Sequence, residues 1–85
     1  MWVRPGNHRV VGTSLAAARK GAGVTQQELA RRLRKPQSFV SDYERGQRRV
    51  DVIELLLIVA ALELDPHKVF ADIVSIRTGR RSRPG

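Results

Sequence analysis

The stretch VTQQELARRLRKPQSFVSDYERG, residues 24–46, carries the strongest structural signals in this chain. Thr25 and Glu28 have the spacing of a capping box, in which the Thr25 hydroxyl accepts from the Glu28 N–H and the Glu28 carboxylate accepts from the Thr25 N–H. A cap of this kind marks the point where a helix begins. The stretch therefore predicts a helix from Gln26 to about Leu33.

A second helix should follow almost at once. Pro36 disfavours helical backbone at Lys35 and suits the first turn of a new helix. We expect that helix to run from Gln37 to about Arg45, with Gly46 ending it. Two short helices separated by so few residues predict a helix-turn-helix.

One further helix is expected on the N-terminal side of this pair. Thr13 or Ser14 can cap a helix that runs to about Lys20. Residues 1–12 include Gly12 and show little periodicity, so we expect a flexible N-terminal arm there.

Two further helices are expected on the C-terminal side. Asp51 can cap a fourth helix that runs to about Leu62. Asp65-Pro66 places an N-cap residue before a proline suited to a first helical turn, which predicts a fifth helix to about Arg77. The predicted fold class is all-α.

Length and composition limit the remaining possibilities. The chain has 85 residues, enough for one small domain, which we place at residues 13–77 with a basic disordered tail at 78–85. It has no cysteine, and its two histidines (His8 and His67) lie far apart, so we expect no metal and no cofactor. The start lacks the apolar segment of a signal peptide, and the longest apolar run, residues 55–62, is far shorter than a membrane span. We therefore expect a cytoplasmic protein with no membrane partner.

The charge is high and unevenly distributed. Sixteen Lys and Arg against eight acids give a net charge of +8. Residues 31–49 include seven basic and two acidic side chains, whereas residues 50–76 include one basic and five acidic side chains. A basic middle with an acidic back favours a polyanionic partner over a uniformly basic, merely solvated surface.

Three stretches, in order, resemble a known family. VTQQELARRL (24–33), SFVSDYERG (38–46) and IVAALELD (58–65) are similar to the Cro/repressor-type helix-turn-helix domain, the XRE family of phage and bacterial regulators. The resemblance covers residues 15–64. It implies a five-helix, phage-repressor-like domain that docks its third helix in the DNA major groove.

The resemblance also implies roles for single residues. Gln37 matches the family's main base reader, and a Gln amide can pair with adenine N6 and N7. Gln26 matches a glutamine that binds phosphate and braces the first residue of the reading helix; the alternative is that both are ordinary solvated glutamines. The matches and the polar face of the third helix together predict which residues contact DNA. The residues expected to contact bases are Gln37, Ser38, Ser41 and Asp42. The residues expected to contact phosphates are Gln26, Lys35, Arg45, Arg48 and Arg49.

Asp42 and Phe39 each have two interpretations. Asp42 can accept a hydrogen bond from cytosine N4, or it can pair with Arg45 three residues further along the helix. Phe39 can touch a thymine methyl group, or it can pack over the edge of the core beside Tyr43, which we favour.

Other matches and departures concern the scaffold. Arg19 and Glu44 match family positions where an Arg of the first helix clamps a Glu at the end of the third. Arg34 stands where a Gly is usual in the turn, and Glu63 where a Gly is usual after the fourth helix. A left-handed backbone at either residue would carry strain of about 1 kcal/mol, and a remodelled turn would change the pose of the third helix.

The fourth and fifth helices hold more apolar surface than one core needs. Val52, Leu55, Leu56, Ile58, Val59 and Leu62 are enough for the domain. The surplus predicts a dimer interface; the alternative is that the fifth helix and the tail fold back over it. The residues expected in that interface are Ile53, Leu57, Val69, Phe70, Ile73 and Ile76.

These observations predict a sequence-specific DNA-binding transcriptional regulator, a dimeric repressor that reads an inverted repeat in double-stranded DNA, encoded by a prokaryote or phage. The alternative is an antitoxin-like module that holds a protein partner and binds DNA for autoregulation. An enzyme is not expected, because the sequence offers no His–carboxylate pair, acidic cluster or nucleophile beside a base. A membrane-surface peptide is disfavoured because the positive charge is split across folded elements.

Overall fold

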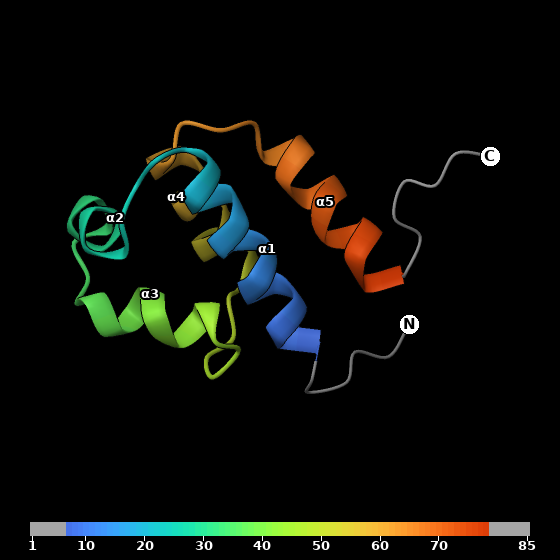
Figure 1. The fold of residues 1–85 in the computed structure, drawn as a ribbon, viewed down its shortest axis with the longest axis horizontal. Coiled ribbons are helices and arrows are strands. Elements are labelled where there is room, and N and C mark those ends of the chain that lie inside the picture. Colours follow the sequence, from blue (N-terminus) through green and yellow to red (C-terminus); the bar gives the residue numbers. More distant parts are fainter. Residues whose placement is uncertain (1–6, 79–85) are drawn as a thin grey trace.

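The computed structural model describes residues 7–78, which fold into five helices without a strand in that range. The helices are α1 (Asn7–Gly21), α2 (Gln26–Leu33), α3 (Gln37–Glu44), α4 (Val52–Ala61) and α5 (Pro66–Thr78) (Figure 1). The all-α, five-helix prediction is confirmed. The predicted tail lies outside the described residues except for Thr78, the last residue of α5.

The caps explain where the helices begin. The Thr25 hydroxyl accepts from the Glu28 N–H at 3.0 Å, so α2 starts where the sequence predicts. The Glu28 carboxylate, however, accepts from the side chains of Arg31 and Arg32, so the predicted capping box is only half formed. These two bonds lower the pKa of Glu28 to about 2. The expected reciprocal bond to the Thr25 N–H is therefore replaced by intrahelical ion pairs.

The complete capping box lies at the start of α4. Asp51 Oδ1 accepts from the Glu54 N–H at 2.7 Å, and Glu54 Oε1 accepts from the Asp51 N–H at 3.1 Å. Asp51 is the cap residue that the sequence predicts, and its partner Glu54 fixes the first turn from the other side.

The start of α1 corrects the sequence-based expectation, because residues 7–12 are helical and do not form an arm. A Cβ at Gly12 would overlap the carbonyl oxygen of Tyr43 and lie 2.8 Å from that of Glu44. Only glycine allows α1 to approach the end of α3 this closely. The local preference of glycine against helix, about 1 kcal/mol, is outweighed by this tertiary contact.

The turns after α2 and α4 keep the left-handed backbone at their unusual residues. Arg34 and Glu63 both have φ of 59°. The turn between α2 and α3 is therefore not remodelled, although a non-glycine side chain in this conformation carries strain of roughly 1 kcal/mol.

The core draws on every helix and on the loop before α2. α1 packs against α3 and α5, and α2 packs against α3 and α4, as Figure 1 shows. Tyr43 is the largest fully buried side chain. The buried apolar residues are Leu15, Val24, Leu29, Ala30, Val40, Tyr43, Ile58, Val59, Leu62 and Val69.

Two core predictions on α4 are wrong. Val52 is 69% exposed and Leu56 is 45% exposed, whereas Ile58 and Val59 are buried. No helix in residues 7–78 has the length and apolar character needed to cross a membrane.

Candidate nucleic-acid interface

The outer face of α3 is polar. Gln37 and Ser38 are exposed, Ser41 and Asp42 are half-buried, and on the opposite face Val40 is fully buried. Positions i, i+1, i+4 and i+5 share one side of a helix. The four residues predicted to contact bases therefore form one continuous strip.

A nearly buried ion pair joins α1 to the end of α3. Arg19 Nε donates to Glu44 Oε2 at 2.7 Å, and Arg19 Nη2 donates to Glu44 Oε1 at 3.1 Å. The side chains are 9% and 6% exposed. Arg19 Nη1 also donates to the Val24 carbonyl at 2.8 Å. The hydrogen bonds that Arg19 donates to Glu44 raise the pKa of Arg19, so the guanidinium stays charged. The clamp geometry expected from the family match is present.

This ion pair continues outward to the surface of α3. Gln26 Nε2 donates to Glu44 Oε1 at 2.8 Å, and Gln37 Nε2 donates to Gln26 Oε1 at 3.3 Å. Arg19, Glu44, Gln26 and Gln37 thus form one hydrogen-bonded chain from the interior to the first residue of α3. The bond to Gln26 uses one N–H of Gln37 and leaves its other N–H and its carbonyl oxygen for a ligand.

Asp42 pairs with Arg45, as one of its two interpretations expects. Arg45 Nη2 lies 2.9 Å from Asp42 Oδ1. The Arg45 side chain is 61% exposed and that of Asp42 42%, so water screens the pair, which contributes only a few tenths of a kcal/mol and can exchange for another partner. The carboxylate thereby reduces the positive charge at the centre of the strip.

Phe39 lies at the edge of the core, and two cationic side chains lie over its ring. Its ring meets Tyr43 edge-on at 5.6 Å, which confirms the core-edge interpretation. Arg48 Cζ lies 4.6 Å from the centroid of the same ring, and Lys35 Nζ lies 5.5 Å from it. Two residues predicted to contact phosphate, one before α3 and one after it, are therefore drawn to one side of the helix. Sequence reasoning did not predict that Phe39 holds Lys35 and Arg48 by cation–π contacts. The signal for it was an aromatic residue among the Lys and Arg residues of the range 31–49.

The arginines after α3 that are predicted to contact phosphate differ in whether they form an ion pair. Arg48 also pairs with Glu54 Oε2 at 2.5 Å. Arg49 is exposed, and within residues 7–78 no carboxylate lies at ion-pair distance from it. In the same range no three His, Asp or Glu side chains are grouped to hold a metal ion.

The predicted dimer residues divide into exposed and covered ones. Ile53, Leu57 and Phe70 are 65%, 57% and 57% exposed. Val69 is 5% exposed and belongs to the core, so its place in the predicted interface is wrong, and Ile73 is half-buried against the core. The side chain of Ile76 lies outside the described part of the chain.

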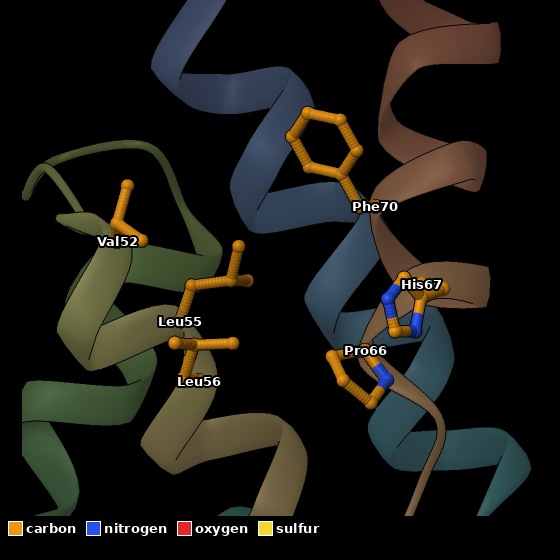
Figure 2. Close-up of a pocket in the computed structure, with 6 residues that line it drawn as sticks. All are labelled: Val52, Leu55, Leu56, Pro66, His67 and Phe70. Carbon is orange, nitrogen blue, oxygen red and sulfur yellow. The ribbon is translucent and has the colours of Figure 1, made fainter.

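An apolar groove of about 370 Å³ lies between α4 and α5. Figure 2 shows the residues of the two helices on opposite sides of it. Its lining residues are Val52, Leu55, Leu56, Pro66, His67 and Phe70. The groove explains why Val52 and Leu56 are exposed: α4 and α5 diverge here and leave their apolar sides uncovered by the described residues.

Comparisons with known proteins agree with this arrangement. A family model described as helix-turn-helix matches residues 15–69. An XRE-family-like protein from Pseudomonas syringae pv. tomato str. DC3000 has 38% sequence identity and a TM-score of 0.73, over 84% of this chain and 87% of that one. No curated protein sequence matches this chain.

Two further solved structures are similar. The clp gene regulator ClgR from Corynebacterium glutamicum has 26% identity and a TM-score of 0.79, over 87% of this chain and 79% of that one. The restriction-modification controller protein C.AhdI from Aeromonas hydrophila has 31% identity and a TM-score of 0.69, over 76% of this chain and 98% of that one.

Proposed function

This chain belongs to the XRE-type helix-turn-helix family of DNA-binding transcriptional regulators, and on that premise we propose that it is a dimeric repressor that reads the major groove with α3. The observation that carries the proposal is the hydrogen-bonded chain that ends at Gln37. An exposed glutamine is usually mobile, whereas this one is held at the first residue of α3 by a partner that is itself fixed to a nearly buried ion pair.

Base reading follows from the atoms that Gln37 keeps available. Adenine presents an acceptor at N7 and a donor at N6 in the major groove, and the free N–H and carbonyl oxygen of a Gln amide match them. Ser38 and Ser41 can donate to or accept from neighbouring bases. Asp42 reads cytosine N4 only if Arg45 turns from it to a phosphate, which their exposed pairing permits.

Phosphate binding uses the cations around α3. Lys35, Arg48 and Arg49 lie before and after the reading helix and would face the backbone on either side of the groove. Gln26, at the start of α2, would donate its second N–H to phosphate while it braces Gln37. These contacts fix the position of α3 and carry no sequence information.

Dimer formation would use the exposed apolar surface of α4 and α5. One helix-turn-helix unit contacts too few base pairs to select a single site in a genome. Two copies related by a two-fold axis would read an inverted repeat whose half-sites are centred about 34 Å apart. Of the residues predicted for this interface, Ile53, Leu57 and Phe70 have exposed side chains that could make the contact. We place the protein in the cytoplasm, where its DNA target would be.

The test begins with selection of bound duplexes from a random pool. We expect enrichment of an inverted repeat, with binding that weakens by several decades of affinity per decade of salt because phosphate contacts release counterions. Failure to enrich any sequence would refute base reading, and a flat salt response would refute phosphate binding. A different protein that copurifies at fixed stoichiometry would instead favour the antitoxin-like alternative.

A further inference from the structure

A polar pocket of about 360 Å³ lies where the start of α1 meets the end of α3. Its lining includes Arg9 and Thr13 from the first turns of α1, which the helix-turn-helix does not use. Arg45 also borders the DNA-reading strip, so the pocket adjoins the C-terminal end of that strip. The remaining lining residues are Glu44 and Gln47.

The position of Arg9 relative to α3 is fixed by two close backbone contacts. α1 passes the carbonyl groups of Tyr43 and Glu44 at Gly12. Gly46 has φ of 77°, and a Cβ there would lie 2.9 Å from the Arg9 Cα. The first turns of α1 are therefore tightly packed on the connection that follows α3, so little backbone freedom is left to lose when Arg9 binds a ligand.

The pocket presents a surplus of positive charge. The carboxylate of Glu44 is already paired with Arg19. Arg45 is held by Asp42 only through an exposed pair. Arg9 is exposed, and within the described residues no carboxylate lies at ion-pair distance from it. An anion here would find the Arg9 and Arg45 guanidinium groups together with the Thr13 hydroxyl and the Gln47 amide.

The dimensions favour a phosphate of the DNA backbone over a free anion. α3 has eight residues and is about 12 Å long, which matches the major-groove width of about 12 Å. With Gln37 at the base edges, the far end of α3 would lie near the sugar–phosphate strand that borders the groove. The pocket at that end also lacks the enclosure that a small anion needs for tight binding, since Arg9, Thr13 and Gln47 are all exposed.

We infer that this pocket binds one backbone phosphodiester of duplex DNA, flanking the bases read by α3, with Arg9 as its main cation. The inference rests on the proposed function and extends the DNA contact surface from the helix-turn-helix to α1. It assigns a role to the six-residue extension of α1 beyond its expected start.

The experiment measures affinity for a selected duplex across a range of salt concentrations, for the full chain and for Arg9→Gln. We expect a several-fold loss of affinity on all sequences alike and a fall in the log–log salt slope of about 0.9, the loss of one phosphate contact. Arg9→Lys should retain most of the slope because the charge stays. The matched control is Lys20→Gln, which removes one exposed charge from the other end of α1 and should leave the slope unchanged.

A second arm identifies the phosphate. Duplexes that carry one uncharged methylphosphonate at successive flanking positions should weaken wild-type binding at one position outside the bases read by α3, and Arg9→Gln should show no further loss there. Inorganic phosphate at low millimolar concentration should not compete. An unchanged salt slope in Arg9→Gln, or equal sensitivity of both proteins at every position, would overturn the inference and leave the proposed function standing. A wild type that binds no duplex would overturn both.

Discussion

The Gln37 amide is hydrogen-bonded to Gln26 in the absence of DNA, and on the proposed base reading this bond bears on how well Gln37 would discriminate bases. Its amide is held by Gln26, and Gln26 is held by Glu44. A side chain already fixed in one orientation loses less rotamer entropy on binding, so more of the interaction energy with the correct base is kept. A wrong base would meet an amide that cannot readily turn to suit it.

Gln37→Ala should therefore cost about 1–3 kcal/mol of binding free energy and relax preference at one base pair. Arg49→Ala is the matched control: it removes an exposed side chain proposed to contact phosphate and should weaken all sequences alike. The measurement is binding to the selected duplex and its single-base-pair variants. Equal weakening of every variant by Gln37→Ala would show that Gln37 does not read a base.

Tyr43 makes a different kind of test, because its hydroxyl is buried and has no hydrogen-bond partner among the described residues. Burial raises the pKa of this phenol. Tyr43→Phe removes the unpaired hydroxyl and keeps the ring, so the free energy of unfolding should stay equal or rise by about 1 kcal/mol. Chemical denaturation measures this, and a loss of more than about 1 kcal/mol would mean that the hydroxyl has a partner.

The same phenol predicts a dependence of stability on pH. The folded-state pKa lies above the unfolded value of about 10.0, so the unfolded chain releases its proton first as pH rises. Stability from this group is complete below pH 10 and falls above it. Because Tyr43 is the only tyrosine, near-ultraviolet absorbance reports its ionisation alone. Titration at the ordinary pKa in the folded protein would contradict its burial.

The ion pair between Arg19 and Glu44 couples the stability of α1 to that of α3. Arg19→Met should destabilise the fold by roughly 3 kcal/mol or more, because Glu44 would stay nearly buried without a counter-charge. Arg19→Met with Glu44→Leu should recover much of that stability. Arg31→Met, which breaks an exposed pair with Glu28, is the control and should cost less than about 1 kcal/mol. Equal melting of Arg19→Met and wild type would refute the clamp.

The double variant also separates folding from DNA binding. Leucine at position 44 cannot accept from Gln26, so the support for Gln37 is lost even where stability returns. We expect the double variant to fold yet to bind the selected duplex with reduced preference at the base pair assigned to Gln37.

Gly12 and Gly21 give a matched pair within one helix. Gly12→Ala would push a Cβ into the carbonyl groups at the end of α3 and should destabilise the fold by about 2–3 kcal/mol or more. Gly21→Ala meets nothing within 4 Å and should be neutral or stabilising, since alanine favours helix. Thermal unfolding of both variants measures the difference. A neutral Gly12→Ala would show that α1 can move away from α3.

The contrast between α1 and α2 explains how much of the fold the sequence predicts. α2 and α3 begin at signals contained in a few neighbouring residues, Thr25 and Pro36, so their bounds could be predicted. The reason for Gly12 lies more than thirty residues away in α3, and nothing local reveals it. In the same way, the Arg19–Glu44 pair and the bond from Gln37 to Gln26 were anticipated only through the family match, whereas the Gln26–Glu44 bond and the pocket at Arg9 have no sequence signal of their own.

Charge and exposed apolar surface lie on different elements: residues 31–49, which contain α3, hold seven basic and two acidic residues, whereas the exposed side chains Ile53, Leu57 and Phe70 belong to α4 and α5. Periodicity alone could not assign Val69 and Val52 correctly, because both helices are apolar on more than one face and the choice depends on which face the other helices cover. The exposed residues Ile53, Leu57 and Phe70 lie on α4 and α5, so a second copy bound there would leave the polar strip of α3 free for DNA.

Leu57→Asp should therefore yield monomers and weaken operator binding by about 100-fold or more, since two linked contacts become one. It is preferable to a charge at Ile73, which packs against the core and would disturb folding. Ala17→Asp, an exposed site on α1, is the control. Sedimentation with and without an inverted-repeat duplex measures the outcome. A monomeric wild type that binds one copy per duplex would refute the dimer and leave DNA recognition intact.

The link from Gln37 to Gln26 and Glu44 also affects how this protein could change its target during evolution. A substitution at position 37 alone would break the exposed bond to the Gln26 carbonyl oxygen, so the new side chain would meet DNA without the support that Gln26 gives to Gln37. A substitution at position 26 alone would break this bond and the bond to Glu44 as well, whereas changing both positions together lets a new pair of side chains support each other. On the proposed base reading, base preference would thus depend on a coupled pair of positions, and libraries designed to retarget the protein should vary residues 26 and 37 jointly.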